Sequence, residues 1–170
     1  MDALTTSAYR TISNHGFAEV RRKNVNDQNA LFALRSYQPG DIIADFSAGT
    51  IASEPTYLTV QVAEGKHITL QPEFLQYINH SCAPNVFFNT TTMKVMALKE
   101  IQQEEEMTFF YPSTEWIMTQ SFNCYCGSPA CLGEIKGAAF LPKQVWKQYR
   151  LTDFILQQLA KKTTARKKVA

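Results

Sequence analysis

With 170 residues, of which 45% are hydrophobic, the chain is long enough to form one domain with a buried core and too short for two such domains. The net charge of +2 excludes the strong overall field that marks dedicated nucleic-acid or membrane-surface binders. No stretch approaches the roughly 18 apolar residues of a membrane span, and the first residues lack an export-signal pattern. We therefore expect a soluble, intracellular protein without membrane partners.

Short strands separated by turns are predicted from about Phe17 to Ala97. Runs rich in aromatic and β-branched residues alternate there with turn-forming pairs such as Pro39-Gly40, and Gly65 allows a positive φ in a tight turn. Strands are predicted at residues 30–34 and 41–46, hairpins at 58–62 with 68–70 and at 86–88 with 93–96, and one helical turn at 73–78. The fold class is therefore mostly β.

After Pro142 the hydrophobic pattern changes to a helical period that continues to Lys162. This predicts one amphipathic helix, with a kink near residues 151–152. The residues from Lys161 to Ala170 are basic and lack apolar periodicity, so we expect them to form a disordered tail.

Three of the four cysteines, Cys124, Cys126 and Cys131, lie close together in the sequence, and the fourth, Cys82, lies far upstream. In a reducing compartment, four cysteines indicate a metal site rather than disulfides, and zinc prefers four tetrahedral thiolate ligands. The alternative is four unrelated buried thiols, which are common in protein cores. A zinc ion bound by all four cysteines would join the loop around Cys131 to the segment that contains Cys82.

Three motifs give the sequence a specific resemblance to the SET-domain protein lysine methyltransferases. They are Gln-Tyr-Ile-Asn-His-Ser-Cys-Ala-Pro-Asn at 76–85, Glu-Glu-Met-Thr-Phe-Phe-Tyr at 105–111 and Cys-Tyr-Cys-Gly-Ser-Pro-Ala-Cys-Leu-Gly at 124–133, and they occur in the family's order. The resemblance implies small twisted sheets around a knot-like crossing, a post-SET zinc loop and a C-terminal helix. The implied organisation is an N-terminal tail (1–8), a SET domain (9–120), a post-SET zinc motif (121–137), a helical extension (138–162) and a basic tail (163–170).

The resemblance also implies an activity, the transfer of methyl groups from S-adenosylmethionine to lysine side chains of another protein. Tyr111 would be the catalytic residue. The implied cofactor contacts are Asn29, Ala30, Asn79, His80, Tyr111 and Leu132, the implied substrate channel is lined by Phe46, Phe88 and Phe109, and the implied zinc ligands are Cys82, Cys124, Cys126 and Cys131. Phe110 is a further candidate for the channel wall, although simple core packing is expected for at least two of these four phenylalanines.

Several positions depart from the family pattern. Gln28-Asn29-Ala30 stands where a G-x-G motif usually lets the backbone approach the cofactor, and Phe46 stands where a tyrosine is usual. Gln76 and Phe110 likewise replace an arginine and an acidic residue. Two alternatives follow: a catalytically weak or inactive SET-like binding module, and a zinc-stabilised β-domain that binds nucleic acid through its basic tail.

The sequence also bears on the product and the partner. In SET enzymes that resemble this chain, a phenylalanine at the positions of Phe109 and Phe88 is associated with higher methylation states, so dimethyllysine or trimethyllysine is the expected product. The partner would be a protein with an exposed lysine, and a histone or another basic protein is the main candidate. The expected location is the cytoplasm or the nucleus, including a host nucleus if the source is microbial.

Overall fold

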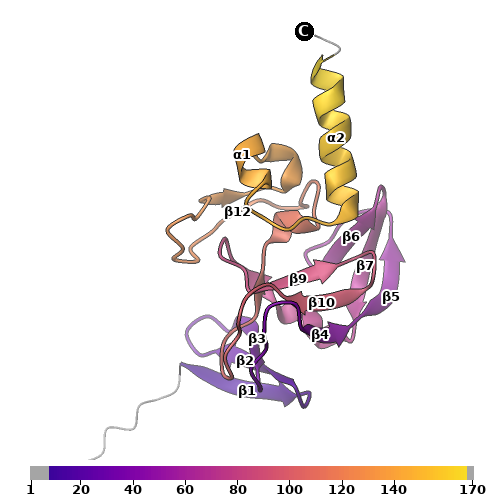
Figure 1. The fold of residues 1–170 in the computed structure, drawn as a ribbon. Coiled ribbons are helices and arrows are strands. Elements are labelled where there is room, and N and C mark those ends of the chain that lie inside the picture. The colour runs from indigo at the N-terminus through magenta and orange to yellow at the C-terminus, as the bar shows by residue number, and fades with distance from the viewer. Residues whose placement is uncertain (1–7, 168–170) are drawn as a thin grey trace, which may run out of the picture.

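A computed structural model describes residues 8–167 of the chain, including side chains up to residue 164. Short strands form several small sheets, and the longest helix lies at the C-terminal end (Figure 1). The predicted fold class, mostly β with small sheets and a C-terminal helix, is confirmed. In the part of the chain that the structure describes, no helix is long and apolar enough to cross a membrane.

The first sheet contains β1 (Tyr9–Asn14), β2 (Ala18–Lys23) and β3 (Asn29–Ala33), in that order and antiparallel. The strand predicted at 30–34 is therefore confirmed as β3. Sequence analysis did not predict β1, because most of its side chains are exposed and it has no apolar alternation.

The second sheet has the order β5-β7-β6 and contains the first predicted hairpin. Its strands are β5 (Ser47–Ala52), β6 (Thr59–Ala63) and β7 (Lys66–Gln71). Gly65 lies in the turn between β6 and β7 with a φ of 58°, as the turn requires. Because β6 is at the edge of this sheet, some of its backbone groups must find partners elsewhere. The predicted helical turn follows as a 3-10 helix, η1 (Glu73–Tyr77).

The third sheet, of order β4-β10-β9, contains the second predicted hairpin. It is formed by β4 (Ile42–Asp45), β9 (Val86–Asn89) and β10 (Lys94–Ala97). A separate parallel pair joins β8 (Asn79–His80) to β11 (Thr108–Phe109), so that His80 lies opposite Phe109. This pairing brings two motifs far apart in the sequence side by side, at the place where the knot-like crossing is expected. The main hydrophobic core contains residues from all three sheets.

The C-terminal part differs from the single kinked helix that was predicted. After the 3-10 helix η2 (Tyr111–Ser113), it contains β12 (Phe122–Asn123), β13 (Glu134–Ile135), a 3-10 helix η3 (Ala138–Phe140), α1 (Lys143–Trp146) and α2 (Asp153–Lys167). Two separate helices form because Thr152 begins a new one: its hydroxyl accepts a hydrogen bond from the N–H of Ile155 at 3.4 Å.

The predicted disordered tail is wrong from Lys161 to Lys167, because α2 continues through these residues. The hydroxyls of Thr163 and Thr164 donate to the carbonyls of Leu159 and Ala160, each at 2.9 Å, within the helix. The helix therefore extends beyond its apolar stripe, where periodicity gives no signal. Residues 168–170 of the predicted tail lie outside the described residues.

Candidate functional site

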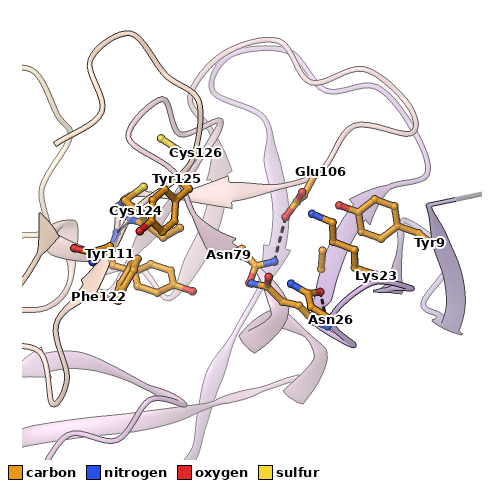
Figure 2. Close-up of a pocket in the computed structure, with 14 residues that line it drawn as sticks. Tyr9, Lys23, Asn26, Asn79, Glu106, Tyr111, Phe122, Cys124, Tyr125 and Cys126 are labelled. Atoms are coloured by element: carbon orange, nitrogen blue, oxygen red, sulfur yellow. Dashed lines mark hydrogen bonds between the residues drawn. The ribbon is translucent and has the colours of Figure 1, made fainter. Parts of the chain in front are cut away.

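A polar cavity of about 560 Å³ lies between the first sheet, the β8–β11 pair and the loop that contains the clustered cysteines. Four of the six expected cofactor residues line it, namely Ala30, Asn79, His80 and Tyr111. Figure 2 shows Asn79 between Tyr111 and Phe122 on one side and Glu106, Lys23 and Tyr9 on the other. The volume is in the range of cavities that hold a small molecule or cofactor.

The side chain of Asn79 is held in this cavity by three hydrogen bonds to two other segments. Its Nδ2 donates to the backbone oxygen of Asn29 at 2.9 Å and to Oε1 of Glu106 at 3.1 Å. Its Oδ1 accepts from Nε2 of Gln28 at 3.5 Å. These bonds tie β8 to the start of β3 and to the strand segment before Tyr111, so the position of Asn79 is fixed before any ligand binds.

His80 is a partly buried, neutral side chain in this arrangement. Burial lowers its pKa to about 4. Its Nδ1 accepts a hydrogen bond from the N–H of Tyr111 at 3.2 Å, so the ring proton is on Nε2, which lies 3.5 Å from Sγ of Cys82. His80 therefore links the backbone of Tyr111 to the cysteine cluster.

Tyr111 is also neutral, and aromatic rings surround it. Burial and the charge of Glu106 raise its pKa to about 12. Its ring lies 4.7 Å from that of Phe109, 5.2 Å from that of His80 and 5.9 Å from that of Phe122, measured between centroids. Its hydroxyl therefore remains a phenol that can donate and accept hydrogen bonds at neutral pH.

A second, mainly apolar cavity of about 520 Å³ begins on the other side of Tyr111. It lies against β6 and η1, and Tyr111 and Phe122 line both cavities. The two cavities therefore meet at these two side chains. Of the three expected channel residues, Phe109 lines this cavity, whereas Phe46 and Phe88 do not.

Phe46 and Phe88 pack behind the cavity wall. Phe88 is fully buried, with its ring centroid 4.7 Å from that of Phe109 and 5.5 Å from that of Phe46. The rings make successive edge-to-face contacts that support the wall from inside the core. Phe110 does not face the cavity either, because its ring stacks on Tyr149 at 3.7 Å with an interplanar angle of 7°. It belongs instead to the contact between η2 and the C-terminal part.

Two other expected cofactor residues do not line the polar cavity. The side chain of Asn29 accepts from Nε of Arg22 at 2.9 Å, and only its backbone oxygen reaches Asn79. Leu132 packs beside the cysteines, and its N–H lies 3.4 Å from Sγ of Cys82. Asn29 could therefore contribute to cofactor binding only through its backbone, and Leu132 only if the cysteine loop moved.

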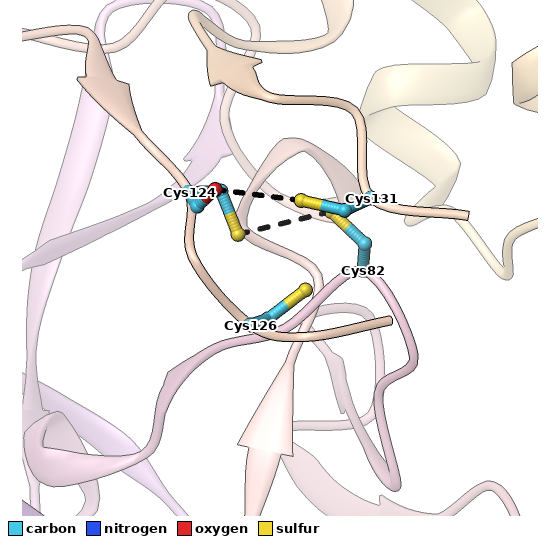
Figure 3. Close-up of side chains that lie close together, drawn as sticks. All are labelled: Cys82, Cys124, Cys126 and Cys131. Carbon is cyan, nitrogen blue, oxygen red and sulfur yellow. Dashed lines mark hydrogen bonds between the residues drawn. The ribbon is translucent and has the colours of Figure 1, made fainter. Parts of the chain in front are cut away.

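The four cysteine side chains converge from two segments of the chain (Figure 3). Their Sγ atoms all lie within 4.8 Å of one another, and those of Cys82 and Cys124 are 4.0 Å apart. Thiolates on a tetrahedral zinc ion, with bonds of about 2.3 Å, are about 3.8 Å apart. Burial raises the pKa of Cys82 to about 11, so this thiol needs a cation to lose its proton. The cluster fits a structural zinc ion in both ligand chemistry and spacing.

The cysteine cluster is also connected to the rest of the molecule. The hydroxyl of Tyr149 donates to the carbonyl oxygen of Cys82 at 2.9 Å. Cys124 and Cys126 line the polar cavity together with Asn79 and His80. Any ion that orders this loop therefore also shapes the cavity wall.

Sequence analysis missed Phe122, Gln61 and Glu115. Phe122 lines both cavities from β12, and Glu115 is a buried carboxyl in the apolar cavity. Burial raises the pKa of Glu115 to about 7, despite hydrogen bonds to its carboxylate from the N–H of Gln61 at 2.8 Å and from the hydroxyl of Thr114 at 3.3 Å. The only sequence signal for Glu115 was a single acidic residue between Tyr111 and Phe122, and it did not indicate burial.

Comparisons with known proteins agree with this geometry. Residues 28–112 match the family model described as "SET domain". The chain is 38% identical over 132 residues to the methyltransferase flvH of Aspergillus flavus, which covers 76% of this chain and 74% of that protein. It is also 29% identical over 101 residues to a Saccharomyces cerevisiae histone-lysine N-methyltransferase specific for H3 lysine 36, covering 52% of this chain and 14% of that protein. A Candida albicans enzyme with the same description is 34% identical over 82 residues, or 10% of its length.

Proposed function

The chain belongs to the SET-domain family of methyltransferases, and from this premise we propose that it transfers methyl groups from S-adenosylmethionine to lysine side chains of a protein. The histone-lysine methyltransferases among its relatives support a protein substrate, and a histone is the first candidate. Such a substrate would be met in the nucleus or, before its import, in the cytoplasm.

The observation that carries the proposal is the meeting of two cavities at Tyr111 and Phe122. Methyl transfer to an amine is an in-line displacement, in which the nitrogen attacks the methyl carbon from the side opposite the sulfur and the sulfur leaves as a neutral thioether when the carbon–sulfur bond breaks. The polar cavity suits a cofactor with a charged amino-acid end and a nucleoside. The apolar cavity suits the four-carbon stem of lysine. Their meeting point is where a methyl group would pass.

S-adenosylmethionine supplies an electrophilic methyl group on a positively charged sulfur. Asn79 is held in place to contact this ligand, and Ala30 and the neutral His80 line the same cavity. Ala30 adds a methyl group where the family usually has a glycine, so we propose that the cofactor lies slightly farther from β3. The segment Gln28-Asn29-Ala30 keeps open the alternative of a binding module with little or no turnover.

A lysine amine must lose its proton before it can attack. With an ordinary pKa of about 10.4, the neutral form costs about 4.6 kcal/mol at pH 7. The apolar walls lower this cost, because desolvation disfavours the ammonium form. We propose that the hydroxyl of Tyr111 holds the neutral nitrogen in line with the methyl carbon, which its raised pKa permits.

We also propose that the product is dimethyllysine or trimethyllysine. The wall beside Tyr111 is the ring of Phe109, and the ring behind it is Phe88. Neither ring has a hydroxyl that could hold the amine or an ordered water in a single orientation. A methylated amine therefore has room to rotate into line for another transfer.

One zinc ion bound by Cys82, Cys124, Cys126 and Cys131 completes the proposal. Its role would be structural, because all four positions of a tetrahedral ion are taken by protein ligands. It would fix the loop that carries two cavity-lining cysteines against the segment after β8. The proposed post-SET motif, residues 121–137, is the part of the chain that this ion would organise.

The proposal is tested by measuring cofactor binding and turnover separately. Isothermal titration with S-adenosylmethionine should show binding, and a pool of lysine-containing peptides should gain methyl groups. Binding without turnover would favour the binding-module alternative. Absence of both, in protein shown to contain zinc and to be folded, would contradict the proposed function.

A further inference from the structure

Glu115 is an ionisable residue buried in the wall of the apolar cavity, and it forms no salt bridge among the described residues. The residue is 8% exposed and lines the cavity together with Tyr111. Its backbone is fixed on both sides, since its N–H donates to the carbonyl of Tyr111 at 3.1 Å and its carbonyl accepts from Ala138 at 2.8 Å. A short turn, fixed by these two backbone hydrogen bonds, therefore carries Glu115 in the wall of the cavity that Tyr111 also lines.

The two carboxylate oxygens of Glu115 have different surroundings. Oε1 accepts both hydrogen bonds, from the N–H of Gln61 and from the hydroxyl of Thr114. Among the described residues, none donates a hydrogen bond to Oε2, and no lysine, arginine or histidine lines the cavity. Glu115 therefore brings to the cavity wall a carboxylate with unused acceptor capacity and no balancing charge among the cavity-lining residues.

A purely structural role accounts for only one of these oxygens. Gln61 lies on the edge strand β6, and Oε1 of Glu115 pairs with its N–H while the side chain of Gln61 accepts from the N–H of Trp116 at 3.0 Å. These bonds attach the turn to the sheet edge. A glutamine at position 115 would accept the same bonds without placing an ionisable group in an apolar cavity, where a charge is costly.

We propose that Oε2 of Glu115 binds an alkylammonium group of the substrate inside this cavity. The inference rests on the proposed function, in which a lysine side chain enters here. The apolar walls, including Leu58, Val60 and Leu70, would contact the carbon stem, and the carboxylate would receive the charged head when the side chain enters, before the target amine loses its proton and is held by Tyr111. Burial raises the pKa of Glu115 to about 7, and a bound cation would favour its ionised form.

The proposal makes Glu115 a specificity residue. It would select a cationic side chain over an uncharged one of equal length, and it would act on substrate binding rather than on the transfer step. The ammonium could be that of the target lysine or that of a neighbouring lysine, and the two sources differ in which peptides depend on Glu115.

The test uses Glu115→Gln, which keeps the shape and the acceptor oxygen for Gln61. Glu64→Gln is the matched control, because Glu64 lies in the turn after β6 with its side chain 81% exposed and lines neither cavity. Two peptide pools serve as substrates, one with a single lysine and no arginine, the other with a second lysine at varied spacing. We expect Glu115→Gln to raise KM about tenfold or more, equivalent to about 1.4 kcal/mol, while kcat changes much less.

The two peptide pools distinguish the two possible sources of the bound ammonium group, the target lysine and a neighbouring lysine. A raised KM for single-lysine peptides identifies the target amine as the bound group, whereas a raised KM only for two-lysine peptides identifies a neighbouring lysine. A KM equal to that of Glu64→Gln in both pools would overturn the proposal while leaving the methyltransferase function intact.

A second measurement on the wild type needs neither turnover nor a folded variant. Titration of isotope-labelled protein with n-butylammonium chloride, followed by NMR, should shift the amide signals of Gln61 and Tyr111 more than titration with 1-butanol does. Equal shifts with the charged and uncharged probes would overturn the proposal. Selective shifts in a protein that methylates no peptide would support the ammonium site and reject the proposed function.

Discussion

Replacing Glu115 with Gln should stabilise the protein against unfolding at neutral pH. Burial raises the pKa of Glu115 to about 7, from an ordinary value of 4.5 that the unfolded chain regains. The folded state holds the proton of Glu115 more tightly than the unfolded state does. The contribution of this group to the free energy of unfolding is therefore fully present below pH 4.5 and is lost as pH rises through 7. Each pH unit between the two pKa values changes the free energy of unfolding by about 1.4 kcal/mol. Between pH 4.5 and pH 7 the wild type should therefore lose about 3 kcal/mol of stability relative to the variant.

Urea unfolding at a series of pH values measures this difference, with Glu64→Gln as control and zinc at constant concentration. Tyr57 and Tyr111, the other titratable side chains that line this cavity, are present in all three proteins, so their contributions cancel. The free-energy difference between Glu115→Gln and wild type should grow from about pH 4.5 to about pH 7, whereas the control should show no such trend. A difference independent of pH would refute the reasoning, because it would mean that Glu115 titrates alike in both states.

Three further predictions concern the proposed site. Freshly purified protein should contain one zinc ion per chain. The substitution Cys82→Ser should lower both the zinc content and the affinity for S-adenosylmethionine. A wild type that is folded and binds the cofactor without any metal would rule the ion out. Tyr111→Phe should reduce kcat about 100-fold or more, by analogy with other positioned hydrogen-bond donors, while the affinity for the cofactor changes little. Unchanged turnover would show that Tyr111 has no role in the transfer step. Phe109→Tyr should shift the products toward monomethyllysine in a mass-spectrometric time course. If the wild type itself stopped at monomethyllysine, the role given to Phe109 would be wrong.

Local sequence signals predicted those parts of the fold that depend on neighbouring residues. Both hairpins were predicted because turn residues such as Gly65 lie between runs of strand-forming residues. The convergence of the cysteines was predicted from the spacing of Cys124, Cys126 and Cys131 together with the total count. In each case the signal lies in a short segment or in a small set of chemically distinctive residues.

Features that depend on tertiary contacts were not predicted. Glu115 meets Gln61 across 54 positions of sequence, and nothing local indicates that the edge of β6 needs an acceptor there. Phe88 and Phe109 both have apolar, strand-like sequence contexts, yet only Phe109 reaches the cavity. The break between α1 and α2 depends on Thr152, whose N–H donates to the carbonyl of Ser113 at 3.0 Å, a contact outside the helical pattern.

The central claim, that lysine is methylated where the two cavities meet, is tested most directly by one mass-spectrometric experiment. Wild type and Tyr111→Phe are each incubated with isotope-labelled S-adenosylmethionine, purified histones and the single-lysine peptide pool. The account predicts labelled dimethyllysine or trimethyllysine with the wild type and far less label with the variant, at similar cofactor occupancy. Label on a residue other than lysine, or equal lysine labelling by both proteins, would contradict it.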